Sequence, residues 1–261
     1  MQLTYYGANT WFFELGNRRI LVDPWLVDSL VFGNQRWFFE GKRRQALEPP
    51  ARIDAILLSQ GLPDHAHEPT LRQLDKTIPV IASASAARLA RKLGYAQVIE
   101  LRHGQTTTLA EGVEIHALPG APIGPMNREN AFVLQARASG RKLYYEPHGY
   151  PPAEARPFAP VDAAISPTVN LELPLAGPII RGEASAPQLV QWLHPQYLLP
   201  TAAGGDIDYS GAIAALLRTR SSLEALRSWL AQQGFSTQVL EPQPGEPVAL
   251  AASSQGAASG S

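Results

Sequence analysis

A short turn that follows an apolar run carries the densest group of chemically active side chains in the sequence. The run is Ala-Ile-Leu-Leu at residues 55–58, and the turn after it contains Asp64, His65, His67 and Glu68. Imidazole nitrogens and carboxylate oxygens bind divalent metals, and they also serve as general acids and bases near neutral pH. Because the carboxyl end of a buried strand opens on a crevice in α/β proteins, this turn is a candidate active site.

The elements around this turn alternate between blocks of strands and blocks of strand–helix repeats. Gly61 and Pro63 end the strand at 55–58, because neither residue suits a strand interior. Two halves that begin with strands and continue with helices predict an α/β (α+β) protein, a four-layer αββα sandwich. The other strands are expected at residues 2–6, 10–15, 19–22, 79–82, 97–101, 106–109, 114–118, 131–136, 142–146, 163–166, 197–200 and 237–240. The helices are expected at residues 71–74, 85–93, 186–193 and 222–233.

The sequence shows no linker between the two halves, so we expect one domain over residues 1–250. Residues 26–52 mix aromatic side chains with glycine and arginine without a clear period, and we interpret them as a hydrophobic flap over the surface. Residues 251–261 are a low-complexity run of alanine, serine, glycine and glutamine, which predicts a disordered tail.

Composition excludes several classes of function. The 261 residues are 45% hydrophobic with a net charge of −1, which suits a large core and gives no electrostatic footprint for nucleic acid or membrane. There is no cysteine, hence no disulfide, thiolate nucleophile or cysteine-based zinc site. No stretch approaches the ~20 apolar residues of a membrane helix, and residues 1–6 do not resemble a signal peptide, so we expect a cytoplasmic protein. Neither a serine-hydrolase elbow nor a P-loop pattern occurs.

Three motifs carry a resemblance to a known family. Tyr5-Tyr6-Gly7 forms a turn, residues 20–25 read Ile-Leu-Val-Asp-Pro-Trp, and the turn at residues 59–65 ends in Asp64-His65. With these motifs the chain resembles metallo-β-lactamase-fold proteins over residues 1–240. The resemblance implies an αββα sandwich and hydrolysis at a centre of one or two metal ions, commonly zinc.

The family's metal motif, Thr/Ser-His-x-His-x-Asp-His, is incomplete here. Gln60 and Leu62 stand where the first two histidines belong, whereas Asp64 and His65 match. Leucine cannot bind a metal, and glutamine is at best a weak oxygen ligand. The sequence Ser-Gln-Gly-Leu-x-Asp-His, together with Tyr-Tyr-Glu-Pro-His further on, resembles a branch of the superfamily known from cyanobacteria and plastids. We therefore interpret this degenerate motif as the pattern of that branch.

The other ligand positions of the family are also altered. Glu146 and His148 flank the position of the bridging aspartate, and Ala202 replaces the last histidine, with Asp206 downstream. Each of these segments follows a predicted strand, so the side chains are expected to converge. The hypothesis is a remodelled metal centre that activates water, with Asp64 and Glu146 as catalytic groups. Its proposed ligands are Asp64, His65, His67, His148 and Asp206. Such a set favours zinc, and manganese and iron accept the same groups.

A second reading keeps Asp64 and His65 for structure alone. An aspartate can hold a turn by accepting backbone N–H bonds, and a histidine can hydrogen-bond across a sheet edge. Two functions of different classes follow. One is a metal-dependent hydrolase of a small molecule such as a lactone, ester or phosphodiester. The other is an inactive member of the fold that binds a ligand or a partner protein.

A third region could contact a substrate. Residues 120–125, Gly-Ala-Pro-Ile-Gly-Pro, predict a rigid loop with small side chains that lets a ligand approach the backbone. Arg128 and Asn130 follow it, and we predict that they bind substrate, Arg128 through a two-pronged contact with a carboxylate or phosphate. The alternative is an ordinary turn before the strand at 131–136. The sequence leaves the substrate and the oligomeric state open.

Overall fold

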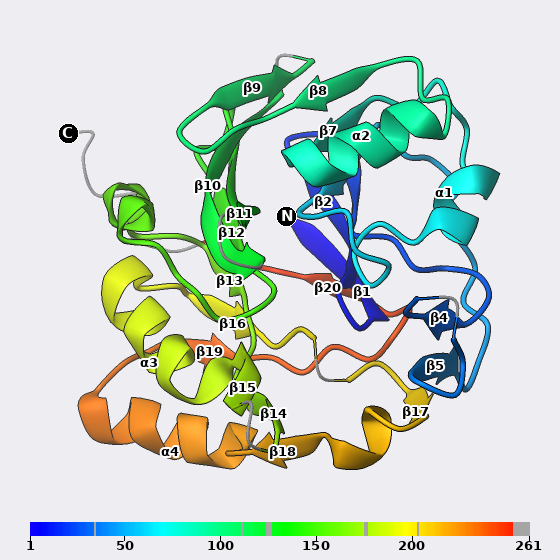
Figure 1. Cartoon of the computed structure of the whole chain (residues 1–261). Helices are drawn as coiled ribbons and strands as arrows, with labels where there is room; N and C mark the ends of the chain where they lie inside the picture. Colours follow the sequence, from blue (N-terminus) through cyan, green and yellow to red (C-terminus); the bar gives the residue numbers. More distant parts are fainter. Residues whose placement is uncertain (34, 111, 124–126, 175–176, 203, 253–261) are drawn as a thin grey trace.

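Two seven-stranded sheets pack face to face in the computed structural model (Figure 1). The structure describes the chain except residues 34, 111, 124–126, 175–176, 203 and 253–261. The first sheet has the order β20-β1-β2-β3-β6-β7-β8 and the second the order β19-β16-β13-β12-β11-β10-β9. The predicted disordered tail lies almost wholly outside the described residues.

The strands of the first sheet are β1 (Gln2–Gly7), β2 (Thr10–Leu15), β3 (Arg18–Val22), β6 (Ala55–Leu58), β7 (Val80–Ala82), β8 (Val98–Glu100) and β20 (Pro247–Ala249). Those of the second are β9 (Thr106–Leu109), β10 (Val113–Ile123), β11 (Asn127–Ala136), β12 (Lys142–Tyr145), β13 (Ala163–Ile165), β16 (Tyr197–Leu199) and β19 (Gln238–Val239). The helices are α1 (Glu68–Gln73), α2 (Ala84–Lys92), α3 (Gly182–Leu193) and α4 (Leu223–Gln233), with 3₁₀ turns at η1 (Ala153–Phe158) and η2 (Ala214–Leu216).

Helices cover the outer face of each sheet and complete the four predicted layers. Ile56 and Leu58 on β6 pack against a stripe of small residues on α2 that includes Ala86, Ala87 and Ala90. Side chains of β11 and β12 on the second sheet pack against α3 and α4. The αββα sandwich expected from the sequence is therefore confirmed (Figure 1).

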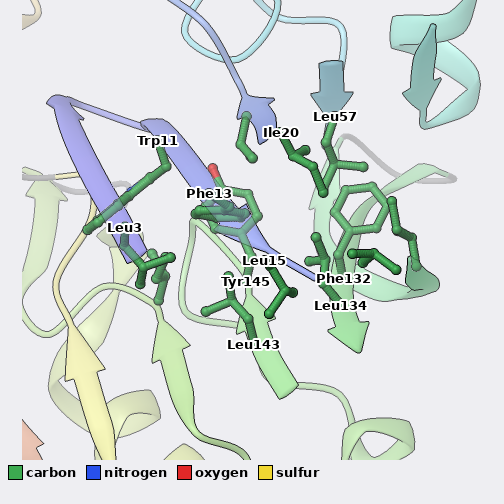
Figure 2. Close-up of a cluster of buried hydrophobic side chains, with 14 of the residues drawn as sticks. Leu3, Trp11, Phe13, Leu15, Ile20, Leu57, Phe132, Leu134, Leu143 and Tyr145 are labelled. Carbon is green, nitrogen blue, oxygen red and sulfur yellow. The ribbon is translucent and has the colours of Figure 1, made fainter. Parts of the chain in front are cut away.

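The core lies between the sheets, where alternate residues of each strand point inward (Figure 2). Leu57 on β6 faces this core whereas its neighbours face α2, which explains why the run at 55–58 is apolar throughout. Aromatic residues fill the centre, and the largest of those that are fully buried are Trp11, Phe13, Phe132 and Tyr145. Tyr145 is notable because its ring packs in the core while its hydroxyl reaches the site described below.

Several elements differ from the sequence-based predictions. The first helix starts three residues earlier than expected, at Glu68, with Pro69 in its first turn. The flap at residues 26–52 contains β4 (Leu30–Val31) and β5 (Glu40–Arg43), and β5 pairs with β17 (Ile207–Ser210). A further small sheet holds β14 (Asn170–Leu173), β15 (Gly177–Arg181) and β18 (Arg218–Arg220).

The predicted loop at residues 120–125 is also different, because its described part, residues 120–123, belongs to strand β10. β10 pairs with β11 beyond a bulge between Pro119 and Pro122, and Arg128 lies opposite Pro122. The sequence suggested a turn because proline is rare inside strands, but a bulge accommodates it. Within the described residues, no helix has the length and apolar character needed to span a membrane.

Candidate metal centre

Three side chains from two turns meet at one end of the sandwich. The turn after β6 supplies Asp64 and His65, and the turn after β12 supplies His148. Candidate ligand atoms of these three residues all lie within 4.8 Å of one another. Glu129 and Glu146 form a second such group that shares His148. The arrangement is compact enough to hold a cation.

His65 is fully buried, and both of its ring nitrogens face carboxylates. Nδ1 lies 2.7 Å from Oδ2 of Asp23, and Nε2 lies 3.1 Å from Oδ2 of Asp64. Asp23 is itself fixed, because it also accepts hydrogen bonds from the Ser59 backbone N–H at 2.8 Å and the Tyr145 hydroxyl at 2.7 Å. The imidazole therefore has one defined orientation.

These contacts shift the titration of His65 and Asp64. Burial opposes a charged imidazolium, but the carboxylates of Asp64 and Asp23 outweigh it and hold the pKa of His65 well above its ordinary value. Burial likewise opposes a charged Asp64, yet His65 outweighs it and lowers the pKa of that carboxyl. Without metal, the pair is an imidazolium bound to a carboxylate.

His148 repeats the arrangement of His65. Its Nδ1 lies 2.7 Å from Oε1 of Glu129, and its ring centre lies 4.9 Å from that of His65. Burial opposes the charged form of His148, but the Glu129 carboxylate raises the pKa of His148 above its ordinary value. Both imidazoles thus have Nδ1 bound to a buried carboxylate, so Nε2 is the nitrogen of each that would bind a metal; in His65 this atom also lies 3.2 Å from Nδ2 of Asn9. A carboxylate at Nδ1 is the usual arrangement of metal-binding histidines.

Glu129 can reach His148 because the residue facing it on β10, Gly120, has no side chain. A Cβ atom added to Gly120 would lie 2.8 Å from Cγ of Glu129, and the backbone N–H of Ala121 donates to Glu129 Oε1 at 3.1 Å. The small residues at 120–121 therefore admit a protein carboxylate, whereas the sequence suggested that they admit a ligand.

Glu146, predicted to be catalytic, shapes the turn that carries His148. Its carboxylate accepts the backbone N–H groups of His148, Gly149 and Tyr150 at 3.0, 2.7 and 2.7 Å. Burial and the nearby Glu129 carboxylate raise the pKa of Glu146 to about 7. Both oxygens are engaged by the backbone, so Glu146 holds the turn, and its predicted catalytic role stays a prediction.

Buried oxygen atoms at this centre indicate that a cation fits. Oδ1 of Asp64 and Oε2 of Glu129 are buried and have no hydrogen-bond partner among the described residues. Oε1 of Gln60 is in the same state. A carboxylate oxygen only accepts, so an unpaired one in the interior is costly unless a donor or a cation faces it. Two imidazoles and two carboxylates are a donor set that zinc, manganese and iron accept.

The structure places two predicted ligands elsewhere. His67 hydrogen-bonds through Nδ1 to Thr70 Oγ1 at 3.0 Å and through Nε2 to the carbonyl of Ser29 at 3.3 Å, which ties α1 to the segment after β3. It lines a separate cleft of about 1120 Å³. Asp206 pairs with Arg44 at 3.3 Å and belongs to neither metal-binding group.

The two predicted substrate contacts also differ from each other. Asn130 is buried and donates to the carbonyl of Leu101 at 2.8 Å, so it joins the two sheets and does not face a ligand. Arg128 is exposed, and its Nε donates to the carbonyl of Gly120 at 2.8 Å, which leaves its two terminal nitrogens free of carboxylates among the described residues. Only Arg128 remains available for a substrate.

Sequence reasoning missed Asp23 and Glu129. Asp23 stands in the Ile-Leu-Val-Asp-Pro-Trp motif, at the end of the strand next to β6 in the sheet, and that neighbourhood was a usable signal. Glu129 carries no such signal, because its approach to His148 depends on the bulge in β10.

Comparison with known proteins identifies the architecture. The family model described as "Beta-lactamase superfamily domain" matches residues 2–202. No curated protein matches the sequence. Among solved structures, an isothiocyanate hydrolase from Delia radicum gut bacteria is 17% identical with a TM-score of 0.70, over 96% of this chain and 99% of that one.

Two other solved structures show the breadth of chemistry on this fold. Igni18, a metallo hydrolase from Ignicoccus hospitalis, is 16% identical with a TM-score of 0.67, over 95% of this chain and 97% of that one. CmlA, a diiron β-hydroxylase from Streptomyces venezuelae, is 17% identical with a TM-score of 0.67, over 95% of this chain and 54% of that one. At these identities the likeness shows a shared fold.

Proposed function

Because this chain belongs to the beta-lactamase superfamily domain family, we propose that it is a metal-dependent hydrolase of a small molecule, with a remodelled metal centre. One observation carries the proposal. His65 and His148 each bind a buried carboxylate through Nδ1, at 2.7 Å, and their ligand atoms lie within 4.8 Å of those of Asp64. The family, the fold and this His/Asp/Glu group together support a metal-dependent hydrolase.

Three side chains would hold the metal, namely Asp64, His65 and His148, and the unpartnered Oε2 of Glu129 can add a fourth ligand while its Oε1 orients His148. A bound divalent cation supplies Lewis acidity, which lowers the pKa of water and polarises the bond to be cleaved. Asp23 and Glu129 fix the imidazole rings, so the centre is organised before substrate arrives. The unpartnered Oδ1 of Asp64 can accept the proton that water loses when it attacks, and can return that proton to the leaving group.

We propose zinc as the metal, on the chemistry of the ligands. Manganese and iron suit the same donors, and the diiron protein on this fold supports keeping them in the test. The isothiocyanate hydrolase supports a small-molecule substrate. A cytoplasmic location and the assignment to the cyanobacterial and plastid branch stay predictions.

Metal content measured by plasma mass spectrometry on untagged protein tests the proposal. We expect close to one metal ion per chain, reduced to about a tenth or less in Asp64→Ala and in His148→Ala. His194→Asn is the matched control, because His194 is exposed, ends α3 in a left-handed conformation that asparagine tolerates, and lies in neither metal-binding group.

A folded protein that takes up none of the three metals would contradict the proposal. It would support the second reading, in which the same crevice binds a ligand or partner without catalysis. Near-UV circular dichroism of each variant separates loss of metal from loss of fold. Protein that retains metal is then tested for turnover on lactones, esters, phosphodiesters and isothiocyanates.

A further inference from the structure

Two arginines line a small cavity that shares the turn of His148 with the proposed metal centre. The cavity has a volume of about 190 Å³, and its lining includes Arg128, Arg181, Gly149 and Tyr150. Gly149 follows His148 in the sequence, and Arg128 precedes Glu129. Two residues of the cavity lining are therefore sequence neighbours of side chains that orient or bind the metal, and Arg181 bonds to the backbone of one of them.

Arg181 is held firmly at this position by its backbone. Its N–H donates to the carbonyl of His148 at 2.9 Å. Gly149 has φ +82°, and a Cβ atom there would lie 2.2 Å from the Arg181 carbonyl oxygen, so only glycine permits this close packing. The guanidinium lies 5.2 Å from the centre of the Tyr150 ring, where the aromatic face favours a cation.

Arg128 reaches the cavity from β11, which belongs to a different sheet from the β15 strand that ends at Arg181. Its Nε–H donates to the Gly120 carbonyl at 2.8 Å, which fixes the plane of the guanidinium and leaves both terminal nitrogens as donors. Within the part of the chain that the structure describes, no carboxylate lies within ion-pair distance of Arg128 or Arg181. Glu129, next to Arg128 in sequence, binds Nδ1 of His148 at 2.7 Å, and Glu183, the acidic residue nearest to Arg181 in sequence, accepts a hydrogen bond from Asn170 at 3.1 Å.

We infer that Arg128 and Arg181 form an anion-binding subsite, and that the substrate of the neighbouring centre carries a carboxylate or phosphate group. Both arginine side chains are exposed and line one small cavity, where an anion between them would offset the repulsion of the two positive charges. Guanidinium groups bind planar or tetrahedral oxyanions through paired hydrogen bonds. This inference rests on the proposed function for the reaction, but the anion site itself does not need the metal.

Titration calorimetry with inorganic phosphate and with acetate tests the subsite. The full chain is titrated as purified and after removal of metal by a chelator and dialysis. We expect one anion to bind per chain in both forms. Arg128→Gln and Arg181→Gln should each weaken it about tenfold, as expected for loss of a charge-assisted hydrogen bond. The tighter of the two anions indicates whether the substrate group is a phosphate or a carboxylate.

Arg88→Gln is the matched control, because it removes the same charge from an exposed position far from the cavity lining. Arg88 lies on α2, the helix that packs against the first sheet. Arg128→Lys keeps the charge but loses the planar fork, and should bind with intermediate affinity. This variant also preserves the test if a glutamine variant fails to fold.

Each remaining outcome is decisive. Absence of saturable binding, or equal weakening by Arg88→Gln, overturns the subsite. Binding that disappears with the metal but survives both arginine substitutions places the anion on the metal, which overturns the subsite and leaves the proposed function intact. Binding that persists in the metal-free chain and is lost with the arginines supports the subsite even if the wild-type chain takes up none of the three metals.

Discussion

The Nδ1 atom of His65 lies 2.7 Å from Oδ2 of Asp23, at the centre of a fully buried network of side chains. Asp23 stands at the end of a strand in the first sheet, and Tyr145, which also donates to it, belongs to the second. The residue that orients the proposed metal ligand therefore also joins the two sheets. The proposed metal binding and the packing of the two sheets would then depend on one carboxylate.

Asp23→Asn should weaken metal binding about 10- to 100-fold, the usual effect of losing a carboxylate behind a histidine ligand. It should also destabilise the fold by about 1–3 kcal/mol, because one amide oxygen replaces two carboxylate oxygens as acceptor for buried donors. Competition with a chelator of known affinity and urea unfolding measure the two effects. Asp75→Asn, at an exposed position, is the control. Unchanged metal affinity in Asp23→Asn would contradict the proposed role of the network.

Metal affinity should rise with pH. Nearby carboxylates, acting against burial, raise the pKa values of His65 and His148, so in the metal-free protein both imidazoles keep a proton on Nε2 to higher pH than an ordinary histidine does. A metal must displace those protons, and each proton released makes the apparent association constant rise about tenfold per pH unit below the pKa. Calorimetry in buffers of different ionisation enthalpy counts the protons. An affinity that does not change between pH 6 and pH 8 would show that the histidines are not ligands.

Glu146 should make the stability of the metal-free protein depend on pH. Burial and Glu129 raise its pKa to about 7, above its ordinary value of 4.5, so the folded state favours the protonated carboxyl. The contribution of Glu146 to folding is then complete below pH 4.5 and is lost as pH rises through 7. The advantage of the wild type over Glu146→Gln in urea unfolding should shrink from pH 5 to pH 8. An advantage that grows over this range would indicate a carboxylate stabilised by its three backbone donors.

His67→Ala should leave metal content unchanged. The imidazole of His67 hydrogen-bonds to Thr70 and Ser29 and lies outside the group formed by Asp64, His65 and His148. Its loss removes two hydrogen bonds, which should lower the free energy of unfolding by about 1–2 kcal/mol. Mass spectrometry and thermal unfolding report the two quantities on the same sample. Loss of metal in the folded variant would restore His67 to the ligand set.

Features set by neighbouring residues could be predicted from the sequence, whereas contacts between distant segments could not. Apolar runs such as residues 55–58 predicted the buried strands correctly, because every side chain is apolar in a strand that is covered on both faces. His65 and His67 stand two residues apart, yet only His65 reaches the centre. The N–H groups of residues 65 and 66 both bond to the Leu62 carbonyl, so the chain winds as a turn, and the strand rule that alternate residues share a side fails there. Glu129 depends on strand register across a bulge, which one sequence does not reveal.

The hydrogen bond from Tyr145 to Asp23 links metal binding to the resistance of the protein to degradation in a cell. A ligand that binds the folded chain alone lowers the fraction of time the chain spends open. Asp23 connects His65 to both sheets, so a metal bound by His65 would stabilise the packing of the two sheets against each other. Chains made during metal shortage would open more often and reach proteases sooner, so cellular metal supply would set how much of this protein persists.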